Sequence, residues 1–271
     1  MHPEGPVEDL EFTLQRKRIE NLFGLDLDSY KPGQMRRRLD SFIANTGAES
    51  VAAFARQLDA DPALREALRD VITINVTEFF RDEPQWKFFE DKILPGVLER
   101  AHRPRIWSAG CSIGAEPYTV AMLLAERGAT AAIDATDFDP RALAKAKNGG
   151  PYRTDEIRGV PPPLLKKYLE SEGDLFRIRS SIRGVPRFRE MNLLTDNFKT
   201  GYDLIICRNV VIYFTDDVKS ELFSRFRDAL APDGVLFLGA TETMLNAEKV
   251  GFTRQSGNFF RRVEDAAQRV A

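Results

Sequence analysis

Residues 105–118, with the sequence RIWSAGCSIGAEPY, constrain the fold of this chain more than any other stretch. Residues 105–108 are typical of a short buried strand, and Gly110 and Gly114 follow in a loop where the backbone can bend sharply and a ligand can approach it. Pro117 is tolerated in the first turn of a helix, and the apolar residues after it continue that helix. A strand, a glycine loop and a helix in this order open a nucleotide-type α/β fold, in which the ligand lies across the loop.

The chemistry of this loop favours a ligand that is cationic at one end. The spacing from Gly110 to Gly114 does not match the dinucleotide fingerprint G-x-G-x-x-G, and the loop lacks the Lys-Ser/Thr pair of a phosphate-binding P-loop. Glu116 stands at the start of the helix, where its carboxylate can pair with a ligand ammonium group. S-adenosylmethionine, which carries a sulfonium and an ammonium group, is such a ligand. An ordinary βα turn that binds nothing remains the alternative on this stretch alone.

The composition excludes several classes of protein. The chain has 271 residues, enough for one large domain or two small ones, and its 43% hydrophobic and 30% charged residues are ordinary for a soluble globular protein. Its net charge of -2 provides no basic field for a nucleic-acid partner. No apolar run approaches the length of a membrane span, and the acidic first residues do not resemble a signal peptide, so we expect a cytoplasmic protein without membrane insertion.

Histidine and cysteine are too rare for several kinds of site. The two histidines, His2 and His102, exclude a histidine-rich metal site and argue against histidine-based acid–base chemistry. The two cysteines, Cys111 and Cys207, are expected to be reduced packing residues. We therefore predict a protein that works without a metal.

Periodicity divides the chain into two domains. Residues 6–72 contain helical patterns and no convincing strand, which predicts a small all-helical domain over residues 1–73. Residues 74–271 alternate strands and helices, which predicts a mainly parallel seven-stranded sheet with a terminal hairpin. Residues 150–186 interrupt this alternation, and we expect an inserted subdomain with a helix and a small antiparallel β element. This is the Rossmann-like α/β architecture of class I S-adenosylmethionine-dependent methyltransferases.

Polar residues follow the predicted strands on the carboxyl edge of the sheet, where open α/β sheets bind ligands. These residues are Glu116, Asp137, Asn192, Arg208 and Asn209. Asp137 ends the second strand, a position at which an acidic residue typically binds ribose hydroxyls. The apolar run of residues 71–82 contains a further polar set that core packing does not explain, namely Asn75, Thr77 and Arg81.

A run of three arginines, Arg36, Arg37 and Arg38, lies in the second predicted helix. At about 100° per residue, Arg37 points away from the apolar stripe of this helix, and its two neighbours flank the stripe. A solvated helix face is the usual explanation of such a run and is favoured on this segment alone. A docking patch for an acidic protein surface is the alternative.

Four segments of the chain, in this order, resemble the chemotaxis-receptor glutamate methyltransferases, the CheR-like family. They are TINVTEFFR (73–81), SAGCSIGAEPY (108–118), CRNVVIYF (207–214) and LGATET (238–243). The resemblance covers nearly the whole chain, from the arginine-bearing second helix to the closing hairpin. It implies an all-helical amino-terminal domain and a class I methyltransferase domain that carries a small β-subdomain, the same division that periodicity predicts.

The resemblance also implies an activity. S-adenosylmethionine would donate a methyl group to glutamate side chains on the cytoplasmic helices of methyl-accepting chemotaxis receptors, giving glutamyl methyl esters and S-adenosylhomocysteine. A glutamate side chain titrates near pH ~4.3 and is already a nucleophile at neutral pH, so that no general base is required. The enzyme would hold this carboxylate in line with the sulfonium carbon, at roughly 3 Å.

By motif position, the resemblance implies a role for each site residue. Asn75, Thr77 and Arg81 are expected at the methionine end of the cofactor, Gly110 in the cofactor loop, Glu116 on the ammonium group, Asp137 on the ribose, Asn192 and Leu193 beside the adenine, and Arg208 and Asn209 on the floor. Two residues are expected to be catalytic. Arg81 would grip a carboxylate through a charge-assisted fork, and Tyr213 would lie near the methyl group and orient the attack through its hydroxyl. A buried tyrosine with a satisfied hydroxyl is the structural alternative for Tyr213.

The resemblance makes Arg36, Arg37 and Arg38 the expected docking residues for the acid-rich receptor helices. The chain departs from the family in two places. Ala115 replaces the first of two consecutive glutamates in the glycine loop. The link of residues 169–174, through which some members bind a carboxyl-terminal pentapeptide of the receptor, is short and has a single glycine. We therefore expect docking that does not depend on a pentapeptide.

Two other functions remain possible on the sequence. One is a class I methyltransferase that acts on another substrate, either a small molecule or a nucleic acid. The net charge and the absence of an N/D-P-P-Y/F motif after the fourth strand, where CRNV lies, argue against a nucleic acid. The other is a non-catalytic module that senses S-adenosylmethionine. Retention of the site residues argues against a module that has lost its catalytic activity. An assay of methyl transfer to receptor fragments distinguishes these two functions from receptor methylation.

Overall fold

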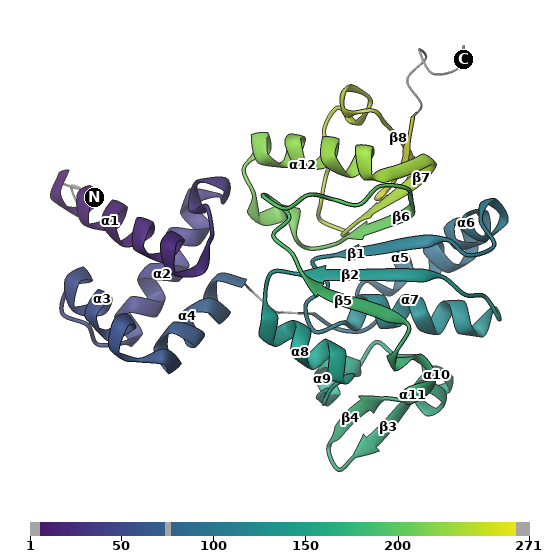
Figure 1. Cartoon of the computed structure of the whole chain (residues 1–271), viewed down its shortest axis with the longest axis horizontal. Helices are drawn as coiled ribbons and strands as arrows, with labels where there is room; N and C mark the ends of the chain where they lie inside the picture. The colour runs from purple at the N-terminus through teal and green to yellow at the C-terminus, as the bar shows by residue number, and fades with distance from the viewer. Residues whose placement is uncertain (1–5, 74–76, 264–271) are drawn as a thin grey trace. The chain divides into compact units, whose positions relative to one another are not determined.

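The computed structural model describes residues 6–73 and 77–263, and the chain divides into two compact units (Figure 1). The first, here called the helical unit, comprises the residues up to 74 together with Tyr213–Thr215. The second, here called the sheet unit, comprises Asn75–Ile212 and the residues from Asp216 onward. Among the described residues, no helix combines the length and the apolarity that crossing a bilayer requires.

The helical unit contains the four predicted helices. They are α1 (Pro6–Phe23), α2 (Pro32–Asn45), α3 (Val51–Ala60) and α4 (Pro62–Thr73), with a short 3-10 turn η1 (Leu27–Ser29) between the first two. Side chains cap two of the helix starts, because Ser50 Oγ accepts a hydrogen bond from Ala53 N and Asp61 Oδ1 accepts one from Ala63 N. The core consists of fully buried apolar side chains, among them Leu39, Phe54, Leu58 and Leu68.

The segment Tyr213–Thr215 completes the helical unit, although it is distant from it in sequence. Lys31 N donates to Tyr213 O at 2.8 Å, and Thr215 N donates to Ser29 O at 3.0 Å. Between these bonds, Tyr30 and Phe214 form an antiparallel bridge, and their rings meet edge to face with centroids 5.2 Å apart. No periodicity in residues 207–214 predicts this association.

The sheet unit is built on a seven-stranded sheet with the order β5-β2-β1-β6-β7-β9-β8. The strands are β1 (Arg105–Ala109), β2 (Ala132–Asp137), β5 (Pro186–Glu190), β6 (Tyr202–Cys207), β7 (Leu230–Leu238), β8 (Phe252–Ser256) and β9 (Phe259–Arg262). The first five in this order are parallel, and the β8–β9 hairpin adds antiparallel strands to β7. The predicted mainly parallel sheet with a terminal hairpin is confirmed.

Helices lie before β1 and in the connections β1–β2, β2–β5 and β6–β7. They are α5 (Glu83–Phe88), the π-helical turn η2 (Phe89–Ile93), α6 (Leu94–Arg100), α7 (Ala115–Glu126), α8 (Pro140–Asn148) and α12 (Asp216–Ala229). A π-helical turn lies before Pro95, which has no N–H to donate, and the helix ends at Arg100. The 3-10 turns η3 (Val211–Tyr213) and η4 (Ala247–Val250) follow β6 and β7.

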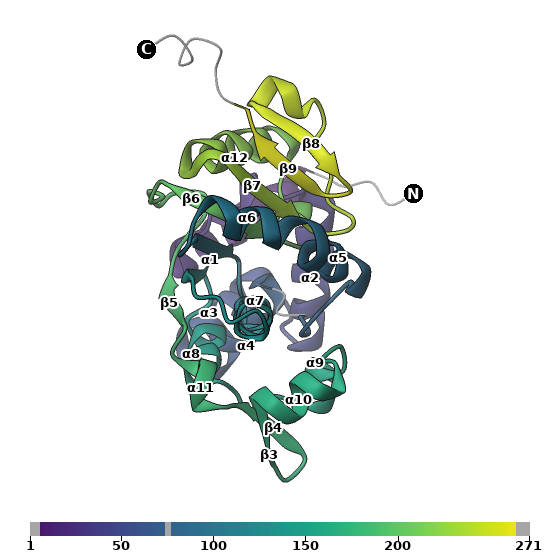
Figure 2. The ribbon, with the colours of Figure 1, turned by 90° about the vertical axis from the view of Figure 1, so that its right-hand side faces the viewer.

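The expected inserted subdomain is present between α8 and β5. It contains α9 (Thr154–Ile157), α10 (Pro162–Tyr168), β3 (Leu169–Glu172), β4 (Leu175–Ile178) and α11 (Ser180–Arg183). Strands β3 and β4 form a separate antiparallel hairpin, whose turn is Gly173 and Asp174. This hairpin and the terminal β8–β9 hairpin lie at opposite ends of the sheet unit (Figures 1 and 2).

Candidate functional site

The candidate site lies at the carboxyl ends of the parallel strands. Strand β1 has β2 on one side and β6 on the other. The connections from β1 to β2 and β5 lead toward one edge of the sheet, and those from β6 onward lead toward the other edge, so that the strand order reverses beside β1. Such a switch point is where open α/β sheets bind ligands. Parallel pairing aligns the strands at this edge, with Ser108 beside both Ala135 and Ile206. The loops that follow β1, β2, β6 and β7 therefore converge.

The loop after β1 depends on its first glycine for two physical reasons. Gly110 has a φ of 81°, which favours glycine, and its N–H donates to Thr136 O at 2.8 Å. A Cβ atom added to Gly110 would overlap Cγ2 of Val210, which comes from the loop after β6. Gly114 has a φ of 86°, and a Cβ atom added to it would lie only 2.9 Å from Cβ of Ala146. These glycines allow the loop to pack closely against its neighbours.

Glu116 presents a carboxylate in the first turn of α7. Ser108 Oγ donates to Oε1 at 2.6 Å, and Nη1 of Arg208 lies 4.0 Å from Oε2. The side chain is only 13% exposed, and this burial raises the pKa of Glu116 to about 7, against the opposing effects of Arg208 and Ser108. The raised pKa means that the surrounding groups compensate the negative charge incompletely. A cationic ligand group beside Glu116 would supply the missing compensation.

Asp137 presents a second carboxylate at the end of β2. Its Oδ2 accepts a hydrogen bond from Ser112 N at 2.6 Å, and its Oδ1 accepts one from Asp139 N at 2.9 Å. Burial raises the pKa of Asp137 to about 6 despite these two bonds. The bond from Ser112 ties the glycine loop to β2, so Asp137 both belongs to the pocket edge and shapes it.

Asn192 and Leu193 follow β5 and lie beside Asp137 along the sheet, because Met191 N donates to Asp137 O at 2.9 Å. Asn192 Oδ1 accepts from Leu194 N at 2.9 Å, which closes a tight turn. Leu193 is buried, and Arg225 of α12 donates to its carbonyl oxygen at 2.5 Å. The turn is therefore fixed on two sides.

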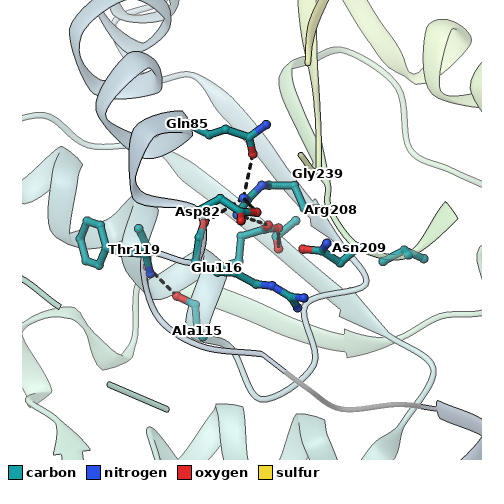
Figure 3. A network of polar contacts seen from close by, with 12 residues as sticks. Asp82, Gln85, Ala115, Glu116, Thr119, Arg208, Asn209 and Gly239 are labelled. Carbon is teal, nitrogen blue, oxygen red and sulfur yellow. Dashed lines mark hydrogen bonds and ion pairs between the residues drawn. The ribbon is translucent and has the colours of Figure 1, made fainter. Parts of the chain in front are cut away.

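Arg208 is a buried cation rather than a surface group, with a side chain that is 3% exposed. Its Nη2 lies 2.9 Å from each of three acceptors, namely Arg81 O, Asp82 Oδ2 and Gln85 Oε1. Figure 3 shows Asp82, Gln85 and Arg208 close to Glu116. The guanidinium also lies over the rings of Trp86 and Phe237, 5.3 Å and 4.8 Å from their centroids. The buried Nε of Arg208 has no hydrogen-bond partner within the described part of the chain. Arg208 thus joins the loop before α5 to the Glu116 side of the pocket.

Glu242 is a buried carboxylate that the sequence analysis did not select. It is 3% exposed and accepts hydrogen bonds from four backbone N–H groups. The donors are Asn209 and Gly239 to Oε2, at 2.9 and 2.6 Å, and Val210 and Val211 to Oε1, each at 2.8 Å. A signal was present, because Glu242 is a charged residue four positions after the apolar end of β7 and lies in the LGATET segment.

Left-handed backbone conformations concentrate at this site. Of the six non-glycine residues with positive φ in the described ranges, four belong to the loops around the pocket, namely Phe80 (55°), Asp82 (62°), Ser112 (45°) and Asn209 (61°). Such conformations cost free energy and persist where surrounding contacts hold them, commonly at functional sites. Side-chain hydrogen bonds hold three of these four residues. Arg208 binds Asp82, Asp137 binds the N–H of Ser112, and Glu242 binds the N–H of Asn209.

The remaining predicted site residues have different positions. Asn75 lies outside the described residues. Thr77 and Arg81 are partly buried, and the carbonyl of Arg81 is bound by Arg208. Tyr213 belongs to the helical unit, where its ring lies below the guanidinium of Arg38 at 5.2 Å.

The three arginines of α2 have different surroundings. Arg37 is exposed, whereas Arg36 and Arg38 are partly buried. Nε of Arg36 lies 3.7 Å from Asp40 Oδ2, and Arg38 covers the ring of Tyr213. Of the three, Arg37 is therefore the most accessible to another protein.

Ala115, the departure in the glycine loop, is fully buried within the hydrophobic core of the sheet unit. Its carbonyl oxygen accepts a hydrogen bond from Thr119 Oγ1 at 2.9 Å, and Figure 3 shows the pair beside Glu116. The alanine side chain thus packs inward, and the neighbouring Glu116 keeps its place in the pocket.

One group of acidic side chains in the described residues has the spacing of a cation site. Glu20, Asp26 and Asp28 of the helical unit bring ligand atoms within 4.8 Å of one another. Arg16 already pairs with Asp28 at 2.6 Å, and Asp26 accepts hydrogen bonds from Asp28 N and Ser29 Oγ. Nε of Arg16 also lies 3.5 Å from Glu20 Oε1, so that all three carboxylates have partners within the chain.

Comparison with known proteins agrees with this geometry. Residues 75–258 match the family described as "CheR methyltransferase, SAM binding domain", and residues 10–73 match "CheR methyltransferase, all-alpha domain". The chain is 37% identical over 263 residues to a chemotaxis protein methyltransferase of Listeria innocua, covering 96% of this chain and 98% of that one. It is 34% identical over 250 residues to chemotaxis protein methyltransferase 1 of Pseudomonas aeruginosa, covering 87% and 91%.

Proposed function

The chain belongs to the CheR methyltransferase family, and from this premise we propose that it methylates glutamate side chains of chemoreceptors. The coarser part of this function, S-adenosylmethionine-dependent methylation in chemotaxis, follows from the family. The glutamate substrate and the ester product are the proposal. The observation that carries it is the pair of buried carboxylates, Glu116 and Asp137, at the carboxyl edge of the sheet, because such a pair suits a cationic cofactor. The scarcity of histidine in the sequence suits a substrate that needs no base.

The residues at the switch point fit S-adenosylmethionine. Glu116 has an incompletely compensated charge, which a ligand ammonium group would satisfy. Asp137 at the end of β2 has the position and the acceptor oxygens for ribose hydroxyls. Asn192 and Leu193 would flank the adenine, and the buried Nε of Arg208 offers a donor. When bound, S-adenosylmethionine supplies an electrophilic methyl group on a sulfonium.

The chemistry left to the protein is orientation and exclusion of water. A glutamate carboxylate is ionised at neutral pH, with a pKa near ~4.3, so that no residue has to remove its proton. The protein has to hold this carboxylate and strip water from it. We assign Arg81 and Tyr213 to this task, because a guanidinium can grip a carboxylate through two bonds and a phenol hydroxyl can donate a third. Asn75 and Thr77 complete the proposed methionine end.

Substrate docking is proposed on the basic face of α2. Arg36, Arg37 and Arg38 give this helix three successive cations, and the methylated helices of chemoreceptors are the acidic partner that we assign to them. The β3–β4 hairpin is joined by only Gly173 and Asp174, which leaves little loop for capturing a peptide. We therefore propose that docking does not depend on a carboxyl-terminal pentapeptide of the receptor.

Titration calorimetry with S-adenosylhomocysteine tests the cofactor site first. Wild type should bind at micromolar levels, Asp137→Ala should lose binding, and Asp174→Ala in the exposed hairpin turn should bind like wild type. A transfer assay with methyl-labelled S-adenosylmethionine and receptor cytoplasmic fragments then tests the substrate. Label that base releases as methanol identifies an ester. Absence of cofactor binding by wild type would refute the cofactor site, and base-stable label or no transfer to receptor would refute the glutamate substrate.

A further inference from the structure

We propose that Glu242 is a positioning residue for the cofactor pocket, which fixes the Asn209–Val211 loop against the glycine loop and thereby sets cofactor affinity. This inference rests on the proposed function, within which the family resemblance assigns Asn209 and Gly110 to cofactor binding. Glu242 itself touches neither cofactor nor substrate in this proposal. It acts through the backbone of residues 209–211.

Both oxygens of Glu242 are used to bind the loop. Oε1 accepts from Val210 N and Val211 N, each at 2.8 Å, and Oε2 accepts from Asn209 N at 2.9 Å and Gly239 N at 2.6 Å. Four acceptor positions are what an ionised carboxylate offers. Three consecutive N–H groups bound to one side chain leave the loop little freedom, so the carboxylate determines the path of the chain as it leaves β6.

This path reaches the cofactor loop through Val210. Asn209 is held at a φ of 61°, a conformation that is unfavourable without compensating contacts. The next side chain, Val210, packs so closely on Gly110 that the glycine has no room for a Cβ atom. A shift of the 209–211 loop would therefore move the wall on which the glycine loop rests.

Glu242 is itself held in place by the turn of the terminal hairpin. Asn258, between β8 and β9, donates through Nδ2 to Glu242 O at 3.0 Å and also to Gly239 O. A Cβ atom on Gly239 would lie 2.8 Å from Glu242 Oε2 and 2.9 Å from Asn209 N. Glycine at 239 is thus required for the carboxylate to reach the loop. The terminal hairpin contributes to the pocket through this brace.

The charge of Glu242 gives the experiment a second readout. Arg208 and Ser108 lower the pKa of Glu116, whereas burial and the negative charge of Glu242 raise it. The thiols of Cys111 and Cys207 also face Glu116. Removing the charge of Glu242 should lower the pKa of Glu116. A role limited to folding would not produce this shift.

The test compares two variants that disturb the loop in different ways. Glu242→Gln keeps the length of the side chain but replaces one acceptor oxygen with an NH2 group that faces backbone N–H donors. Gly239→Ala keeps the charge and displaces the carboxylate. Glu248→Gln, an exposed glutamate in η4, is the matched control. The measurements are calorimetric titration with S-adenosylhomocysteine from pH 6 to 8 and hydrogen exchange of the amides of residues 209–211 in the full chain.

Glu242→Gln and Gly239→Ala should each weaken binding by about tenfold or more, and the control should not. The pH midpoint of affinity should fall in Glu242→Gln and stay unchanged in Gly239→Ala. Folded variants of either kind that bind like wild type would overturn the proposal. If Glu242→Gln does not fold, the cofactor affinity of Gly239→Ala decides whether the proposal holds. If wild type binds no S-adenosylhomocysteine, the proposed function fails. Hydrogen exchange then still tests whether Glu242 fixes the 209–211 loop, because the amides of this loop should be protected in wild type and exposed in Gly239→Ala.

Discussion

Glu116 has a pKa of about 7, so in the free protein its carboxyl group is about half ionised at neutral pH. The cause is burial, which Arg208 and the hydrogen bond from Ser108 offset only in part. Binding a ligand ammonium group favours the charged form and lowers this pKa. The same residue therefore couples ligand binding to proton release.

We expect the affinity for S-adenosylhomocysteine to rise as the pH rises from 6 through 7, and to level off once Glu116 is ionised in the free protein. The sign follows because the pKa is raised in the free state and lowered in the bound state. Asp137, with a pKa of about 6, should add to the dependence at the lower end. Calorimetry in buffers of different ionisation enthalpy measures the released protons. Glu116→Gln should remove the dependence near pH 7 and weaken binding by about tenfold or more. An affinity that is flat between pH 6 and 8 in wild type would contradict the assignment.

The glycine loop and the loop after β6 form one packed element of the site, joined by the contact of Gly110 with Val210. Gly110→Ala should therefore lower the free energy of unfolding by about 1–3 kcal/mol and abolish cofactor binding, because of both the positive φ and the overlap. In the double variant Gly110→Ala, Val210→Ala, the overlap is relieved and part of the stability should return. Denaturant unfolding of the four proteins of this cycle measures the coupling.

Gly33 is the matched control for this cycle, because a Cβ atom there meets nothing within 4 Å. Gly33→Ala should be neutral or stabilising by up to about 1 kcal/mol. Two independent, additive effects of the Gly110 and Val210 changes would show that the contact does not govern the loop.

Helix α2 allows the proposed docking role of Arg37 to be tested apart from the contact of Arg38 with Tyr213. Arg37→Glu should raise the KM for receptor fragments about three- to tenfold and leave S-adenosylhomocysteine affinity unchanged, because Arg37 is exposed and acts by charge. Arg38→Ala should in addition lower kcat, because Arg38 covers the ring of Tyr213. Arg56→Glu, on the exposed face of α3, is the control. Steady-state kinetics at two ionic strengths checks this, and loss of cofactor affinity in Arg37→Glu would argue against docking.

At the scale of the whole molecule, the sequence predicted what depends on local chemistry. The glycine loop, the all-helical amino-terminal part and the mainly parallel sheet follow from periodicity and turn residues, and the structure confirms them. The hydrogen bonds that Glu242 accepts from the 209–211 loop could not be predicted in this way, because the three donors lie 31 to 33 residues away in the sequence. Arg208 was expected on the pocket floor, and only the fold reveals that it is buried against Asp82.

The segment Tyr213–Thr215 makes the chain pass between the two units three times, after residues 74, 212 and 215. The helical unit is consequently not a module that can be cut out by dividing the gene once. A fragment ending at residue 74 lacks the backbone bonds that Lys31 and Ser29 make with this tripeptide. Chimaeras that exchange helical units between relatives to alter receptor choice should carry residues 213–215 with the unit. A substitution in residues 213–215 would therefore affect the helical unit, although these residues follow β6 in the sequence.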